Sequence, residues 1–381
     1  MTRNRYLHPE DSPLFSPWTD PRSGVVSYIL SARVAPWQQS FYFTNQPVPF
    51  DGRYMWVYAS CPPTPFHTLG VVDFKTGEAR LVPETAFKEA SPMVDLETGE
   101  VYWAHPHTRE VYRRGPGKDD PVQVIGQVPW ETFGGRPLHR ISTHLSFSAD
   151  RKWLNLDIEA GDTWHAGAME LATGKYENWD SFDRRFNHSL FSPVDPDLQL
   201  IAQDWWNDVK TGVHHRYVNR IYLLRRGEKA QPIYPNSERG NRISHEWWGA
   251  DGSKVWYVDY DLGTFSYELA SGATECVWPG GTCHSQCDGA GLLLTGDINT
   301  YKGQKEKPVR IGFFNRHTGK EIDVVSDWPV PPMRAAVSGY HVHGHPQFIC
   351  DGEFITYSST VYGRPDVALV RVADLVKLTS A

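Results

Sequence analysis

The chain has 381 residues, which is enough for two or three ordinary domains or for one large all-β domain. Forty per cent of the residues are hydrophobic and 22% are charged, so we expect a folded protein, and no run of 18 apolar residues predicts a membrane-spanning helix. The net charge of −7 and the lack of a Lys/Arg block argue against a nucleic-acid binder. A local basic pocket could still bind a small anion.

The first residues and the cysteines indicate the cellular compartment in which we expect the protein. Met1 to Arg5 leads into proline- and charge-containing sequence without the apolar segment of a secretory signal. The five cysteines are odd in number and form no Cys-x-x-Cys pair, which favours a reducing compartment over a disulfide framework or a zinc ribbon. We therefore expect a cytoplasmic protein with no membrane partner, and no pattern indicates its oligomeric state.

The first 35 residues are rich in proline, and a repeat follows them. From about residue 40 to residue 375, an aspartate turn recurs before an apolar strand. These turns begin at Asp51, Asp95, Asp150, Asp195, Asp251, Asp288 and Asp351. Their average spacing of 50 residues is typical of a repeat protein.

A second turn lies about 20 to 30 residues after several of the aspartate turns. It reads Thr-Gly or Ser-Gly, at Thr76-Gly77, Thr173-Gly174, Ser271-Gly272 and Thr318-Gly319. Each unit then holds four short strands, which is the pattern of a β-propeller blade. The sequence predicts an all-β, seven-bladed β-propeller that forms one domain over residues 1–381. We expect residues 1–35 to pack on the propeller or to close its ring.

Many of the 16 histidines precede the aspartate turns at a similar point of their units. They are His144, His188, His245, His284 and the run His341-Val342-His343-Gly344-His345. Loops of a propeller meet around its central channel, so equivalent positions in five units would direct these imidazoles towards one axis. A single histidine would more often be a hydrogen-bonded structural residue.

The run from His341 to His345 is the sharpest local pattern. In an extended strand, alternate residues point to one face, so at least two of these imidazoles could reach the same ion. With His284 they would form a three-histidine site with open positions, suited to Mn²⁺, Zn²⁺, Fe²⁺ or Ni²⁺. The alternative is a polar strand end at the mouth of the channel.

Other residues support less specific interpretations. His105 and His107 are typical of a surface loop, whereas His215, next to His214, could line the mouth of the channel. The 15 tryptophans fit aromatic cores between sheets, and the competing interpretation is platforms on which sugars stack. No Walker A sequence, G-x-G-x-x-G, G-x-S-x-G or H-E-x-x-H is present, so nucleotide binding and a serine nucleophile lose support.

The chain resembles the oligogalacturonate lyases, a family of metal-dependent seven-bladed propellers, from about Arg185 to Val372. The stretches that carry the resemblance are Asn187-His188-Ser189-Leu190-Phe191-Ser192-Pro193-Val194-Asp195, Val218-Asn219-Arg220-Ile221-Tyr222, Ser244-His245-Glu246-Trp247-Trp248, Cys283-His284-Ser285 and His343-Gly344-His345-Pro346-Gln347-Phe348. A closing hairpin at residues 356–363 is similar as well.

The resemblance implies roles for individual residues. His284, His343 and His345 would be metal ligands, with Mn²⁺ the favoured ion. His245 would be the base, and Arg220 would contact the substrate carboxylate or act in catalysis. The family's fourth ligand is a glutamine. Tyr340 occupies that position here, with His341 beside it, and either of the two could replace the glutamine as a metal ligand.

We therefore expect a lyase that cleaves short uronic-acid oligosaccharides by β-elimination. Residues expected to contact this small acidic substrate are His144, His188, His215, Trp205 and Trp247. Trp206 and Trp248 are their neighbours, and one of each pair could instead pack in a blade core. Two alternatives stay open. They are a lyase for another uronate linkage, of the rhamnose–glucuronate or ulvan type, and a propeller that binds a sugar or protein without catalysis.

Overall fold

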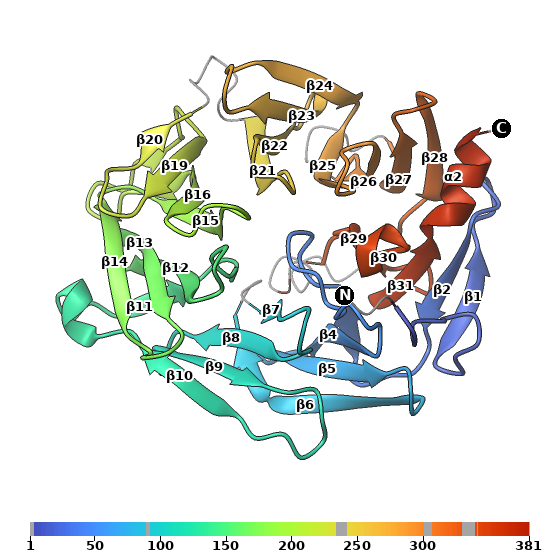
Figure 1. Cartoon of the computed structure of the whole chain (residues 1–381), viewed down its shortest axis with the longest axis horizontal. Coiled ribbons are helices and arrows are strands. Elements are labelled where there is room, and N and C mark those ends of the chain that lie inside the picture. Colours follow the sequence, from blue (N-terminus) through green and yellow to red (C-terminus); the bar gives the residue numbers. More distant parts are fainter. Residues whose placement is uncertain are drawn as a thin grey trace.

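The computed structural model describes residues 4–88, 92–233, 242–300, 307–329, 340 and 342–380. Within these residues, seven antiparallel sheets of four or five strands are arranged around a central axis, as Figure 1 shows. The predicted all-β, seven-bladed propeller is confirmed. No helix among the described residues is long and apolar enough to cross a membrane.

The first three blades are built from consecutive strands, given from the channel outwards. Blade 1 contains β3 (Trp37–Gln39), β4 (Tyr54–Ser60), β5 (His67–Asp73) and β6 (Glu78–Phe87). Blade 2 contains β7 (Met93–Val94), β8 (Val101–His105), β9 (Glu110–Arg114) and β10 (Gln123–Gln127). A 3₁₀ turn, η1 (Trp130–Phe133), leads to blade 3, which contains β11 (Leu138–Ile141), β12 (Trp153–Ala160), β13 (Thr163–Glu170) and β14 (Tyr176–Phe182).

Blades 4 to 6 follow the same order. Blade 4 contains β15 (Phe186–Phe191), β16 (Leu198–Gln203), β19 (Ile221–Arg225) and β20 (Gln231–Pro232), with a small hairpin of β17 (Trp206–Asn207) and β18 (His214–His215) inserted after β16. Blade 5 contains β21 (Ile243–Trp248), β22 (Lys254–Asp259), β23 (Gly263–Glu268) and β24 (Thr274–Pro279). Blade 6 contains β25 (Thr282–Cys287), β26 (Leu293–Ile298), β27 (Arg310–Asn315) and β28 (Lys320–Val325).

Blade 7 joins the two ends of the chain. It contains β29 (Gln347–Ile349), η3 (Cys350–Gly352), β30 (Phe354–Ser359) and β31 (Asp366–Arg371), and then β2 (Val26–Leu30) and β1 (Phe15–Thr19) on its outer side. Tyr28 pairs with Leu369 across the β2–β31 ladder. The N-terminal strands thus extend the last sheet, beside the helix α2 (Val372–Ser380) in Figure 1.

The two recurring turns occupy fixed places in the blades. Each aspartate turn joins the first strand of a blade to the second, and each Thr-Gly or Ser-Gly turn joins the third to the fourth. In the Asp51 turn the carboxylate accepts the N–H of Arg53, and Gly52 takes a φ of +70°, which glycine adopts at low cost. The carboxylates of Asp95, Asp150, Asp195 and Asp251 accept the N–H two residues further on in the same way, so the sequence repeat reflects a turn chemistry that recurs in five blades.

The blades pack through aromatic side chains. Trp56, Trp103 and Trp278 are almost fully buried, and Trp56 and Trp103 share one apolar cluster between blades 1 and 2. For these three residues the core interpretation of the tryptophans is the correct one.

The first residues also cover part of the face that carries the aspartate turns. The Arg5 N–H donates to the carbonyl of Asp51, the Asn4 amide donates to Glu353, and Leu7 is fully buried. The opposite face is thereby left to the starts of the inner strands and to the loops between second and third strands, where the histidines lie.

Candidate active site

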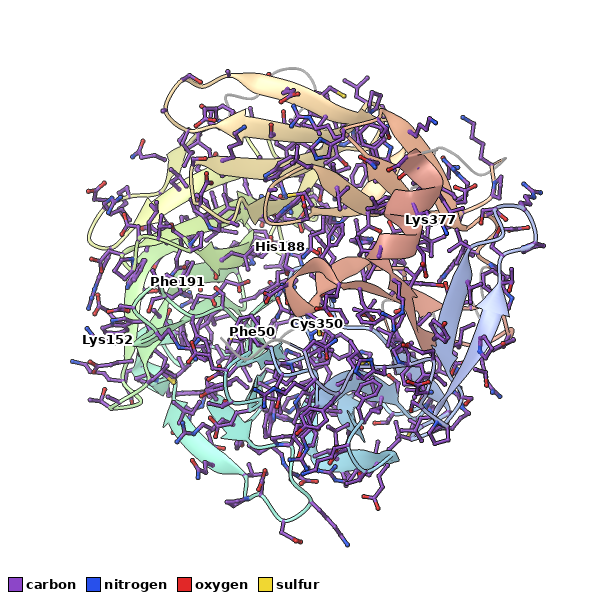
Figure 2. The ribbon with its side chains drawn as sticks, turned by 45° about the vertical axis from the view of Figure 1, so that its right-hand side comes forward. Phe50, Lys152, His188, Phe191, Cys350 and Lys377 are labelled. Carbon is purple, nitrogen blue, oxygen red and sulfur yellow. The ribbon has the colours of Figure 1, made fainter. Side chains whose placement is uncertain are left out.

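The inner strands of blades 4, 5 and 6 each contain a bulge at the predicted histidine. The ladder with the second strand shifts between Asn187 and Leu190, between Ser244 and Trp247, and between Thr282 and Ser285. A bulge breaks the alternation of a strand and re-aims a side chain. Figure 2 shows His188 towards the centre of the ring, with Lys152 at its rim.

The backbone at several of these positions is left-handed. The φ angles are 56° at His188, 53° at His245 and 43° at His345, a region that residues other than glycine enter rarely. In blade 3, Ser142, which lies two residues before His144, takes a φ of 59°. His188 and His245 thus reach the channel from left-handed turns within their inner strands, and His345 from one just before β29.

Three imidazoles from blades 6 and 7 form a candidate metal centre. Ligand atoms of His284, His343 and His345 all lie within 4.8 Å of one another. His284 and His345 are buried, and their ring centroids are 4.2 Å apart. Three neutral imidazoles at this separation suit Mn²⁺, Zn²⁺, Fe²⁺ or Ni²⁺, so the donor set fits the metal expected from the sequence.

Asp297, on β26, orients this centre. Its carboxylate accepts the Nδ1–H of His284 at 2.9 Å and also the backbone N–H groups of His284 and His345. A carboxylate only accepts, so Nδ1 carries the proton and Nε2 presents its lone pair. Burial raises the pKa of Asp297, while the nearby His343 opposes this rise. Such a carboxylate–histidine pair is the usual support of a metal ligand.

His245, the candidate base, lies beside the metal centre. Its ring centroid is 4.1 Å from that of His284, and its Nδ1 donates to the carbonyl of Cys283. Because a carbonyl only accepts, the lone pair of this imidazole is on Nε2. In its neutral form, His245 therefore has one defined basic atom, Nε2.

Arg220 is buried and paired with carboxylates. Its Nε and Nη2 donate to both oxygens of Glu246 at 3.0 Å, and its Nη1 lies 3.3 Å from Asp204. Burial disfavours the charged guanidinium, but Glu246 and Asp204 outweigh it and raise the pKa of Arg220. In this arrangement Arg220 fixes Glu246, which lies 3.7 Å from His188 Nδ1.

His144 and His188 form a second pair of imidazoles in the channel. His144 Nε2 and His188 Nδ1 are 3.4 Å apart. Burial, His144 and Arg220 hold the pKa of His188 well below its usual value, so this ring is neutral. A neutral His188 can exchange hydrogen bonds with a sugar without adding charge.

Sequence reasoning missed Tyr42, whose ring lies among the histidines. It stacks on His144 at 4.2 Å between ring centroids and lies 4.9 Å from His345 and 5.7 Å from His284. Burial and the nearby Glu246 raise the pKa of Tyr42 well above its ordinary value. Its place before the first aspartate turn, at the point where other units carry histidine, was the available signal. Asp297 and Glu246 carried no comparable signal.

The structure does not bring every predicted residue to the centre. The Tyr340 hydroxyl donates to the carbonyl of Thr64, and its ring packs against Trp37 and His67. His341 lies outside the described residues. Trp247 is buried and stacks on Trp256 within blade 5.

Two predicted contact residues lie in the exposed insertion of blade 4. Trp205 is 47% exposed, with Arg185 over its ring, and His215 stacks on Trp206. This insertion lies on the same face as the histidines, because it joins the second and third strands of its blade. It could therefore contact an extended substrate.

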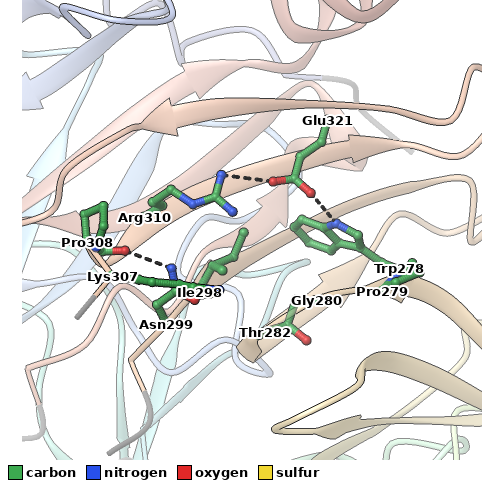
Figure 3. A pocket seen from close by; sticks show the side chains of 11 residues that line it. Trp278, Pro279, Gly280, Thr282, Ile298, Asn299, Lys307, Pro308, Arg310 and Glu321 are labelled. Atoms are coloured by element: carbon green, nitrogen blue, oxygen red, sulfur yellow. Dashed lines mark hydrogen bonds and ion pairs between the residues drawn. The ribbon is translucent and has the colours of Figure 1, made fainter. Parts of the chain in front are cut away.

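A cavity of about 300 Å³ lies between β24 of blade 5 and the strands of blade 6 (Figure 3). Arg310 and Trp278 both donate to Glu321 there, and Arg310 also pairs with Asp323. Because its arginine is already paired with two carboxylates, we assign no substrate group to this cavity.

Comparisons with known proteins agree with the architecture. No family model matches the chain. The chain is 25% identical over 228 residues to an oligogalacturonide lyase of Pectobacterium atrosepticum and 24% identical over 226 residues to an oligogalacturonate lyase of Dickeya dadantii. Each alignment covers 55% of this chain and 55% of the relative, so the chain spans about half the length of the curated relatives it matches.

Solved structures match over nearly the whole chain. An oligogalacturonate lyase in complex with manganese has a TM-score of 0.77 at 16% identity, covering 99% of this chain and all of that one. An oligogalacturonate lyase of Vibrio parahaemolyticus has a TM-score of 0.74 at 16% identity, covering 98% and 97%. The resemblance to these lyases is confirmed, and the chain has their seven-bladed fold.

Proposed function

We propose that the protein is a divalent-metal-dependent lyase that cleaves short uronic-acid oligosaccharides by β-elimination, leaving a 4,5-unsaturated sugar. The observation that carries the proposal is the position of His245, whose Nδ1 is hydrogen-bonded to the Cys283 carbonyl, beside the His284, His343 and His345 cluster. The similarity to proteins named oligogalacturonate lyases supports oligogalacturonate as the first substrate to test.

The chemistry needs a base next to a cation. Elimination removes the C5 proton of a uronate and expels the C4 oxygen, and the neighbouring carboxylate gains charge as the proton leaves. A bound divalent ion would stabilise that charge as a Lewis acid, with Mn²⁺ our first choice. His245 Nε2 would take the proton, because the neutral form of an imidazole is a suitable general base near neutral pH.

Arg220 would act in this site as a positioning residue, by holding Glu246 in place. Its bidentate pair with Glu246 holds that carboxylate next to His188, so it shapes the wall on which the sugar lies. For Arg220 to contact the substrate carboxylate directly, its ion pair with Glu246 or with Asp204 would have to break. Full turnover by Arg220→Ala would remove Arg220 from the site.

The second candidate is a lyase for another uronate linkage. The position at which the resembled family carries a glutamine ligand is Tyr340 here, and its hydroxyl bonds to Thr64 in blade 1. A different group at that position could change the sugar accepted. We also propose a cytoplasmic location, since the five cysteines are present as thiols.

The test is the ultraviolet absorbance of the unsaturated product. Purified protein with Mn²⁺ is mixed with a panel of uronate oligosaccharides, with and without EDTA. An EDTA-sensitive rise is expected, and the substrate that gives it separates the two lyase candidates. His284→Ala should abolish the rise, whereas His317→Ala, which alters an exposed histidine of the β27–β28 turn, should not. Sugar binding without a rise on any substrate would instead identify a binding propeller.

A further inference from the structure

A second set of metal-binding atoms overlaps the candidate centre. His245, Cys283 and His284 offer ligand atoms that all lie within 4.8 Å of one another. The Cys283 sulfur is 3.9 Å from His245 Nδ1. In a tetrahedral zinc site, bonds of about 2.3 Å to sulfur and 2.0 Å to nitrogen put these two atoms about 3.5 Å apart. The set is thus close to the geometry that a thiophilic ion requires.

The two sets share one atom. Because Asp297 accepts the Nδ1–H of His284, Nε2 is the atom that this imidazole offers to an ion. One nitrogen lone pair binds one ion, so the His284–His343–His345 set and the His245–Cys283–His284 set cannot both be filled. Mn²⁺ has little affinity for sulfur and prefers the imidazole set, whereas thiophilic ions such as Cd²⁺ and Zn²⁺ gain from the set with sulfur.

We propose that His245, Cys283 and His284 form an inhibitory site for thiophilic divalent ions such as Cd²⁺ and Zn²⁺, which excludes the ion held by the three histidines and disables the base. The inhibition rests on the proposed lyase function, but the binding does not.

The proton balance explains how the base is lost. Binding through sulfur releases the Cys283 thiol proton to solvent. Binding through His245 Nδ1 displaces the proton that this atom donates to the Cys283 carbonyl, and the proton moves to Nε2. Nε2 is the basic atom of the resting imidazole, so the ion leaves His245 unable to accept the substrate proton. One proton is released for each ion bound.

The test uses Cd²⁺, because a cadmium–thiolate bond gives a charge-transfer band in the ultraviolet. The exposed thiols Cys61 and Cys276 are first replaced by serine in every protein used. Titration with Cd²⁺ should give the band with release of one proton. Cys283→Ser should remove the band and weaken Cd²⁺ binding by about 10- to 100-fold. His343→Ala, which leaves this set intact, should keep the band.

Two further measurements make the outcome decisive. Adding Mn²⁺ should reduce the band by competition, and simultaneous binding of both ions would overturn the shared-ligand argument. A band that persists in Cys283→Ser, or no band in a parent that binds Cd²⁺, would overturn the site. Thermal unfolding checks that each variant is folded.

Inhibition of the lyase reaction is measured separately from metal binding. Zn²⁺ added at constant Mn²⁺ should inhibit the parent, and Cys283→Ser should need about 10-fold more Zn²⁺ for half-inhibition relative to its own uninhibited rate. If the band behaves as expected but no lyase activity is found on any substrate, the proposed function fails while the metal site stands.

Discussion

The carboxylate of Asp297 sets the orientation of His284 and, through it, of both sets of ligands. Its two oxygens bind the ring and backbone of His284 and the backbone of His345, which belong to different blades. A ligand held in this way needs little reorganisation when an ion binds, and the paired imidazole is a stronger donor.

We therefore expect Asp297→Asn to weaken Mn²⁺ binding by about 10- to 100-fold, since the amide cannot polarise the imidazole as a carboxylate does. Calorimetric titration with Mn²⁺ measures the effect. Asp323→Asn is the control, because Asp323 lies on β28 of the same blade and pairs with Arg310 outside the centre. Equal affinities in the two variants would remove Asp297 from the support of the site.

The pair of Arg220 and Glu246 is almost fully buried, with side-chain exposures of 2% and 0%. Glu246→Ala leaves a buried guanidinium with less compensation, and we expect a loss of about 3–5 kcal/mol in the free energy of unfolding. Urea denaturation measures it. Glu275→Ala breaks the exposed pair with Arg316 and should cost about 0–1 kcal/mol. Similar losses in both variants would contradict the account.

At the scale of the strand, the blades were predictable because one turn chemistry recurs, and an aspartate before an apolar segment is visible in sequence. The bulges were not. Nothing near His188 or His245 marks a positive φ, since no glycine stands there. The run that ends at His345 was expected to be an extended strand, but β29 begins at Gln347. His343 and His345 converge on His284 nevertheless, with a turned backbone at His345.

A strand-level prediction concerns His165 on β13, whose two ring nitrogens lie 3.1 and 2.8 Å from the hydroxyls of Thr163 and Ser181. Burial, and then Arg136, lower its pKa in the folded protein. Above about pH 6.5 both states are neutral and the shift has no effect. Below that pH, His165 is protonated in the unfolded chain but stays neutral in the folded protein. The free energy of unfolding therefore falls with pH until the pKa of His165 in the folded protein is reached.

Replacing His165 by glutamine should flatten this part of the curve, by up to about 1.4 kcal/mol per pH unit. Denaturation curves between neutral and mildly acidic pH measure it. Other histidines add their own slopes, so the comparison is between variant and parent. Parallel curves would show that His165 does not contribute.

For the molecule as a whole, the ring is held together where its ends meet. Seven units were visible in the sequence, but the partner of the first 35 residues was not, because pairing between β2 and β31 joins residues more than 300 positions apart. The sequence left open whether these residues pack on a face or close the ring. In the structure residues 4–7 lie on the face of the aspartate turns, and β1 and β2 belong to blade 7.

Ile29 tests the closure, because it pairs with Ala368 and is 1% exposed. Ile29→Ala should lower the free energy of unfolding by about 2–5 kcal/mol. Val26→Ala alters the same strand at a residue that is 39% exposed and should change stability by about 0.5 kcal/mol or less. Chemical denaturation of the two variants makes the comparison, and equal effects would mean that the β2 interface adds little.

The left-handed backbone at His188, His245 and His345 lowers the stability of the fold in order to place imidazoles in the site. Each such residue costs of the order of 1 kcal/mol, and asparagine or glycine would adopt the same conformation more easily. If variants of this protein were selected only for stability at high temperature, asparagine or glycine would therefore replace histidine at these three positions. Such variants would keep the seven blades and melt later, and they would have lost the imidazoles.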